Sequence, residues 1–99
     1  MKKFRKYEEK LMQDLQDPKL ANEYLSVALV DSNPQVFLLA LKDICKARGM
    51  KITTLAEKTK LSRENLYRIL SNKGNPKLTN IMSILNAIGL ALAVQKNKK

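Results

Sequence analysis

The chain has 99 residues and carries 19 lysines and arginines against 9 aspartates and glutamates, a formal net charge of +10. This length fits one small domain, and the hydrophobic content of 44% is enough for one modest core. One cysteine and no histidine exclude an internal disulfide, a multi-cysteine metal site and histidine-dependent catalysis, and they indicate a reducing, cytoplasmic location.

Three helices are predicted in the first half of the chain. The first covers residues 4–16, where Glu8 and Glu9 interrupt the apolar run that a signal peptide would need. Asp17-Pro18 and Asn33-Pro34 each place a capping side chain before a proline at the first helical position. The second helix therefore runs from residue 18 to about residue 30, and the third from residue 34 to a stop at Gly49. The third helix is expected to point its apolar side chains inward: Phe37, Leu38, Leu41, Ile44 and Cys45.

The second half of the chain is predicted to hold three more helices and one short strand. Two short helices fill residues 52–71, and a last helix covers residues 78–88 before Gly89. Residues 90–94 are apolar without helical periodicity, which favours a strand; the tail of the last helix is the alternative. A lone strand has unpaired backbone groups, so a second copy or another protein would have to pair with it unless it packs as an apolar tail.

The spacing within residues 52–71 is typical of a helix-turn-helix. Ala56 is small where two helices would cross, and Leu61 is expected to pack beneath the turn that joins them. Leu66 and Ile69 fall on the inner side of the second helix. Lys60 stands where this motif usually has glycine, and a left-handed lysine costs about 1 kcal/mol relative to glycine.

The opposite side of this second helix carries long hydrogen-bonding side chains that can reach base edges in a DNA major groove. Ser62 is suited to cap the helix and to contact phosphate. Residues 49–77 also hold 7 basic and 2 acidic side chains, half of the excess charge, which favours a polyanionic partner over a merely solvated face. The expected DNA-binding residues are Ser62, Arg63, Glu64, Asn65, Tyr67, Arg68, Lys73 and Asn75.

Several segments together resemble the HigA-like probable addiction-module antidote family. The specific part is the run from Leu61 to Arg68, Leu-Ser-Arg-Glu-Asn-Leu-Tyr-Arg, followed by Gly74-Asn75-Pro76. Weaker similarity extends over roughly residues 4–94. The resemblance implies a small antitoxin with a Cro/repressor-type helix-turn-helix. It also implies that the protein neutralises a RelE/ParE-fold, HigB-like, mRNA-cleaving toxin and, as a homodimer, represses its own operon by binding operator DNA.

The fold expected from these observations is an all-α, repressor-like helix-turn-helix bundle. Residues 1–33 form an N-terminal helical extension that is the candidate toxin-binding region, residues 34–89 form the DNA-binding domain, and residues 90–99 form the C-terminal strand and basic tail. The two helices of the extension go beyond the minimal motif, so they either cover the domain's own core or bind a partner. In the second case the extension supplies the candidate toxin contacts: Phe4, Tyr7, Leu11, Leu15 and Tyr24.

Two other functions stay open at this point. One is a free-standing, phage-type transcriptional repressor without a toxin partner. The other is a helical adaptor whose basic face meets an acidic protein. The carboxylates form no evident acid–base pair and the chain has no glycine-rich phosphate loop, so we expect neither an enzyme nor a cofactor or metal, and no membrane partner.

Overall fold

The fold of the chain was obtained as a computed structural model, which describes residues 2–31, 33–71 and 74–96, with side chains from residue 6 onward. These residues form an all-α bundle of six helices without a strand. The helices are α1 (Lys2–Asp14), α2 (Pro18–Leu29), α3 (Pro34–Ala47), α4 (Ile52–Thr59), α5 (Arg63–Ile69) and α6 (Leu78–Ala87).

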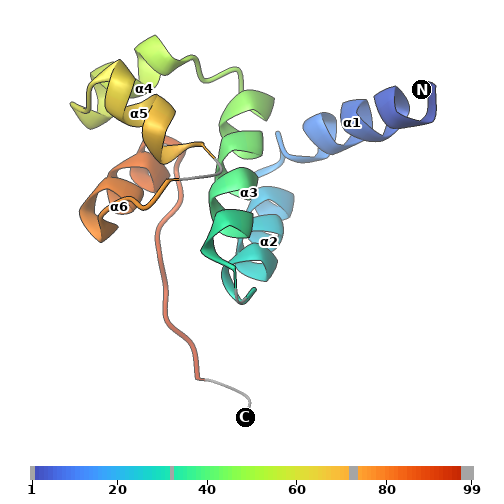
Figure 1. Cartoon of the computed structure of the whole chain (residues 1–99). Coiled ribbons are helices and arrows are strands. Elements are labelled where there is room, and N and C mark those ends of the chain that lie inside the picture. Colours follow the sequence, from blue (N-terminus) through green and yellow to red (C-terminus); the bar gives the residue numbers. More distant parts are fainter. Residues whose placement is uncertain (1, 32, 72–73, 97–99) are drawn as a thin grey trace.

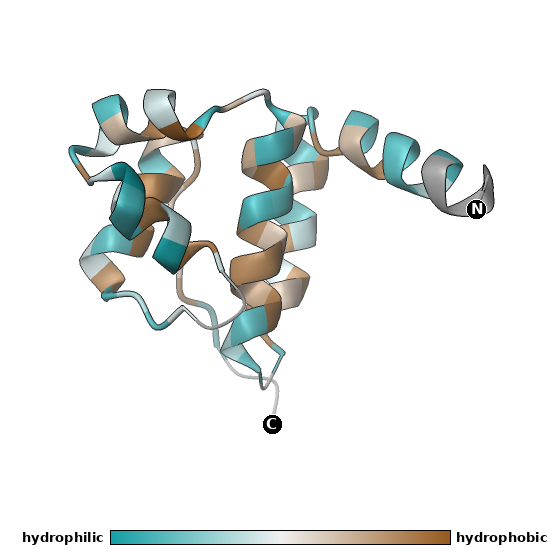
Figure 2. Ribbon diagram, turned by 45° about the horizontal axis from the view of Figure 1, so that its top comes forward, coloured by the Kyte–Doolittle hydropathy of each residue, from teal (hydrophilic) through white to brown (hydrophobic). Residues whose placement is uncertain are grey.

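Helix α3 lies at the centre of the molecule. On one side α2 packs along it, and α1 contacts it before projecting away from the body; on the other side α4 packs against α5 and α6 (Figure 1). Helices α2 to α6 each contribute buried apolar side chains to this interior (Figure 2). One continuous core joins the N-terminal helices to the rest, since Leu15, directly after α1, and Leu25 of α2 belong to the same buried cluster as Leu41 and Leu66.

The predicted starts of α2 and α3 are confirmed, and their caps are formed by the expected side chains, whereas α1 begins at Lys2, two residues before the predicted start. The side chain of Asp17 accepts a hydrogen bond from the backbone N–H of Lys19, and that of Asn33 accepts one from the N–H of Gln35. The residue before a proline is driven out of the helical region, and Asp17 is extended with φ −79° and ψ 120°. The chain therefore cannot run as one helix through Asp17. Helix α1 ends at Asp14, two residues earlier than predicted, and a short turn follows before α2.

The turn between α4 and α5 has the geometry that the sequence predicts. Lys60 is left-handed, with φ 64°, and its N–H closes α4 on the carbonyl of Ala56. The hydroxyl of Thr59 donates to the carbonyl of Leu55 and accepts from the N–H of Leu61, at 2.6 and 3.2 Å. These bonds hold the turn, so that α4 and α5 form a helix-turn-helix.

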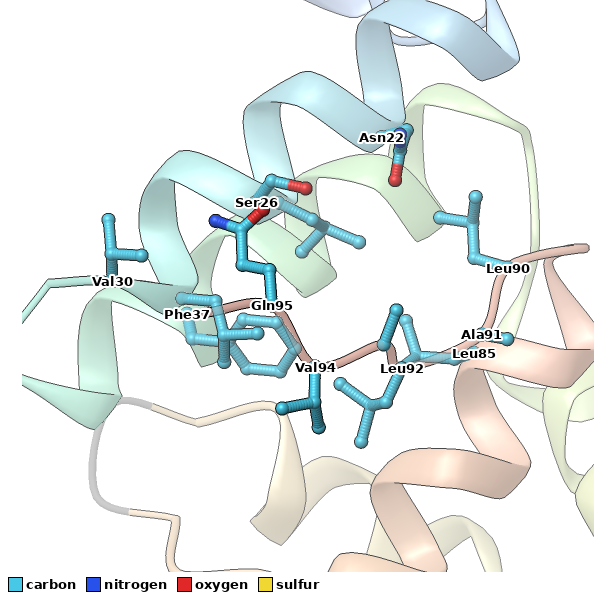
Figure 3. A pocket seen from close by; sticks show the side chains of 13 residues that line it. Asn22, Ser26, Val30, Phe37, Leu85, Leu90, Ala91, Leu92, Val94 and Gln95 are labelled. Atoms are coloured by element: carbon cyan, nitrogen blue, oxygen red, sulfur yellow. The ribbon is translucent and has the colours of Figure 1, made fainter. Parts of the chain in front are cut away.

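The C-terminal segment departs from the strand prediction. Residues 90–96 have neither strand nor helix structure; they run as an extended chain beside α2 and α3 (Figure 3). Leu90 and Leu92 are half-buried against the core, whereas Ala91 and Ala93 are exposed. A strand requires a neighbouring chain for its ladder of hydrogen bonds, and no other segment of the described chain lies in position to supply one.

Candidate functional site

The outer face of α5 is a row of four exposed polar side chains. Arg63, Glu64, Tyr67 and Arg68 are all exposed, Tyr67 by 64%. On the opposite face Leu66 and Ile69 are buried in the core. The burial of one face therefore fixes which side chains α5 presents to solvent, as the sequence predicts.

The start of α5 is held by its own cap. The hydroxyl of Ser62 accepts a hydrogen bond of 3.0 Å from the N–H of Asn65. Ser62 is exposed and Asn65 is half-buried. The capped first turn keeps the backbone of Arg63 and Glu64 ordered. In helix-turn-helix proteins the N-terminal residues of the second helix contact base edges in the major groove, and Arg63 and Glu64 hold these positions in α5.

The segments before and after α5 in the chain carry exposed positive charges. Exposed lysines occur on α4, in the turn and before α6: Lys51, Lys58, Lys60 and Lys77. Asn75 is exposed in the loop after α5, while Lys73 lies outside the described residues. The loop is fixed to α3 because the side-chain amide of Gln35 donates to the carbonyl of Gly74 at 2.9 Å.

The five candidate toxin contacts differ in accessibility. Tyr7 is exposed, Leu11 is half-buried, and the side chain of Phe4 lies outside the described part. Leu15 is only 1% exposed in the core, so a partner could not reach it without unpacking α1. Tyr24 is half-buried.

Tyr24 has a defined hydrogen bond. Its hydroxyl donates to a carboxylate oxygen of Asp43 on α3 at 3.0 Å. Burial first, and then the hydrogen bond to Asp43 and its negative charge, together raise the pKa of Tyr24 from 10 to about 12. The tyrosine therefore stays protonated and links α2 to α3.

An apolar groove between α1, α2 and α3 was not predicted as a unit. Besides the expected Leu11, Leu15 and Tyr24, it is lined by six apolar side chains outside the set of candidate toxin contacts: Leu20, Val27, Ala28, Val36, Leu39 and Ala40. The sequence shows that these residues are apolar. Only the packing of α2 on α3 decides which of them stay exposed at the surface.

Cys45 lies in the core, as predicted. It is 3% exposed, and burial raises the pKa of its thiol to about 11, partly offset by the positive charge of Arg48. Among the described residues there is no group of three or more potential metal ligands. No helix in that part of the chain is long and apolar enough to span a membrane.

Comparison with known proteins places these features in a family. A family model described as "Probable addiction module antidote protein" matches residues 5–96. The chain belongs to this antidote family. A protein of Haemophilus influenzae (strain Rd) named "Uncharacterized protein" is 37% identical over 75 residues, which cover 76% of this chain and 75% of that protein. No solved structure matches the chain. Membership in the antidote family implies an antitoxin role and a toxin partner.

Proposed function

We propose that this antidote is the antitoxin of a type II toxin–antitoxin module that both neutralises a HigB-like, mRNA-cleaving toxin and represses its own operon. Residues 1–33 would serve the toxin and residues 34–89 the operator. The observation that carries the DNA-binding part is the exposed polar row on α5, opposite the buried Leu66 and Ile69 and flanked by exposed lysines.

In this proposal α5 enters the major groove. Arginine side chains there make bidentate hydrogen bonds to guanine, and the flanking lysines pair with phosphates. One recognition helix covers only a half-site, so specific binding needs two copies whose α5 helices are about 34 Å apart along the duplex. The protein would act as a homodimer on a palindromic operator.

The antidote family favours the antitoxin over a free-standing repressor, because an antidote needs a toxin. The two proposals share the α5 face and differ in the partner. Co-expression with the neighbouring gene separates them. A small basic protein that co-purifies with the chain, and whose toxicity the chain suppresses, supports the antitoxin; a neighbour without toxicity or binding contradicts it.

The DNA-binding part is tested with Arg68→Ala and the upstream palindrome. Loss of a base contact should weaken operator binding by about 1–3 kcal/mol, with the fold intact because Arg68 is exposed. Lys19→Ala on α2 removes an equally exposed positive charge far from α5 along the chain, and serves as the matched control.

Binding should also weaken steeply as salt rises, since phosphate contacts release counterions. Equal operator affinity for wild type, Arg68→Ala and Arg63→Ala would exclude α5 as the recognition helix. Binding to acidic proteins without any preference for the palindrome would favour the adaptor function instead.

A further inference from the structure

The groove between α1, α2 and α3 exposes an unusual amount of apolar surface. Val27 on α2 is 71% exposed and Leu39 on α3 is 57% exposed, although α3 contributes more buried core residues than any other described helix. Leu20 and Val36 extend the same surface. Contiguous apolar side chains at a surface mark a site for a partner when they gather in one concave place.

The floor of the groove is already ordered. Leu15, Ala28 and Ala40 are buried beneath it, and the Tyr24 ring is held by the hydrogen bond of its hydroxyl to Asp43. A partner that binds here loses little free energy to ordering the receptor side.

The charge of the groove is opposite to that of the chain. The protein carries a net charge of +10, yet the charged side chains that line the groove are Asp14 and Glu23, both acidic. A partner with lysines or arginines beside an apolar surface is therefore complementary to it.

The same charges disfavour a second copy of this chain in a symmetric dimer through the groove. In a two-fold interface each subunit presents the same patch to the other. Asp14 and Glu23 of one subunit would then face an equally acidic groove, and like charges brought together in an interface cost several kcal/mol.

We propose that this groove is the toxin-binding site, and that its occupant is a basic, amphipathic segment of the toxin. The inference rests on the proposed function, because an RNA-cleaving toxin needs positive charge to hold its substrate. Apolar side chains of that segment enter between Val27 and Leu39, while its lysines or arginines pair with Asp14 and Glu23. Leu39 and Val36 make α3 a contact helix together with α1 and α2.

The experiment uses the full chain and the purified toxin encoded by the neighbouring gene, inactivated in its catalytic site. Deletion of residues 1–16 would remove the buried Leu15 from the core, so surface substitutions are used. The test variant is Val27→Lys/Leu39→Lys. It replaces two apolar side chains of the groove with positive charges, which repel the basic segment of the toxin. The matched control is Leu78→Lys/Met82→Lys on α6, where both side chains are also exposed. Operator binding and circular dichroism verify that each variant is folded.

We expect the groove variant to bind the toxin at least about 100-fold more weakly, as for a central pair of interface residues, and the α6 control to bind as wild type. Glu23→Lys should weaken binding about ten-fold, and less at high salt, where exposed charges are screened. Amide signals of the labelled chain should shift on α1, α2 and the outer face of α3 when toxin is added.

Three results distinguish the possible failures. Wild type that does not bind the toxin contradicts the proposed function and this inference with it. Wild-type affinity in the groove variant overturns the groove assignment alone. If wild type sediments as a dimer and the groove variant as a monomer, with toxin binding unchanged, the groove is an interface between two antidote chains.

Discussion

Gly74 is the position at which a single methyl group should have the largest measurable effect on the fold. A Cβ atom there would lie 2.5 Å from the carbonyl oxygen of Ile69 and 2.8 Å from that of Arg68. Both oxygens belong to the backbone at the end of α5, so no side-chain rotation relieves the contact. The loop or α5 itself must move, and the carbonyl of Gly74 also accepts the hydrogen bond from Gln35.

The cost of Gly74→Ala follows from this overlap. Forcing an extra carbon into a packed site costs about 1–3 kcal/mol. For a domain of this size each kcal/mol lowers the melting temperature by about 4–8 °C, so we expect a fall on the order of 10 °C in thermal unfolding followed by circular dichroism. Operator affinity should fall as well, because the displaced oxygens lie in the helix that carries Arg68.

Gly49→Ala provides a control with a different physical cause. Gly49 has φ +65°, and its added Cβ would meet no atom within 4 Å. The alanine would therefore cost about 1 kcal/mol of backbone strain without displacing α5. If Gly74→Ala were as stable as wild type, or less destabilised than Gly49→Ala, the steric argument for the loop would be wrong.

Three further predictions concern single side chains. Lys60→Gly should stabilise the protein by up to about 1 kcal/mol in urea unfolding, because glycine adopts φ 64° without strain; a loss of stability would contradict the role of the left-handed turn. Cys45 should resist alkylation until the protein unfolds, because its thiol is buried and its pKa is about 11; rapid reaction of the native protein would refute this. The pKa of Tyr24 is about 12 in the folded chain, against 10 for an unperturbed tyrosine, so the stability that its proton contributes is full below pH 10 and declines as the pH rises to about 12. Tyr24→Phe should flatten that decline in urea unfolding, and parallel curves for both proteins would refute it.

Local chemistry made the helix boundaries predictable. A cap acts within three residues, so Asp17-Pro18, Asn33-Pro34 and Ser62 could be recognised without knowledge of the fold. The outward face of α5 was predictable for a related reason, since Leu66 and Ile69 fix the buried side of a short helix. The conformation of residues 90–94 was not predictable, because an apolar segment becomes a strand only where the backbone of another segment pairs with it.

The groove could not be derived from periodicity. Leu15 and Leu20 both belong to helical apolar stripes, yet Leu15 is 1% and Leu20 is 38% exposed. A stripe shows that a helix face is apolar, and only the packing of the other helices shows whether that face is covered within the chain. Residues 36–41 of α3 are apolar without interruption and so reach round the whole helix, but this run does not show that Val36 and Leu39 stay uncovered while Phe37 and Leu38 are buried.

The way α1 is attached has a consequence for local opening. Residues 6–10 are exposed. The helix is anchored by the half-buried Leu11 and Met12, and the turn that follows it by Leu15 in the core. Amide hydrogens near the start of α1 can therefore exchange with solvent by fraying, at a free energy far below that of global unfolding. The N–H of Leu15 donates to the carbonyl of Leu11 at 2.9 Å and belongs to a core residue, so it should exchange only when the core opens. Protection from hydrogen exchange should therefore rise along this segment near Leu11.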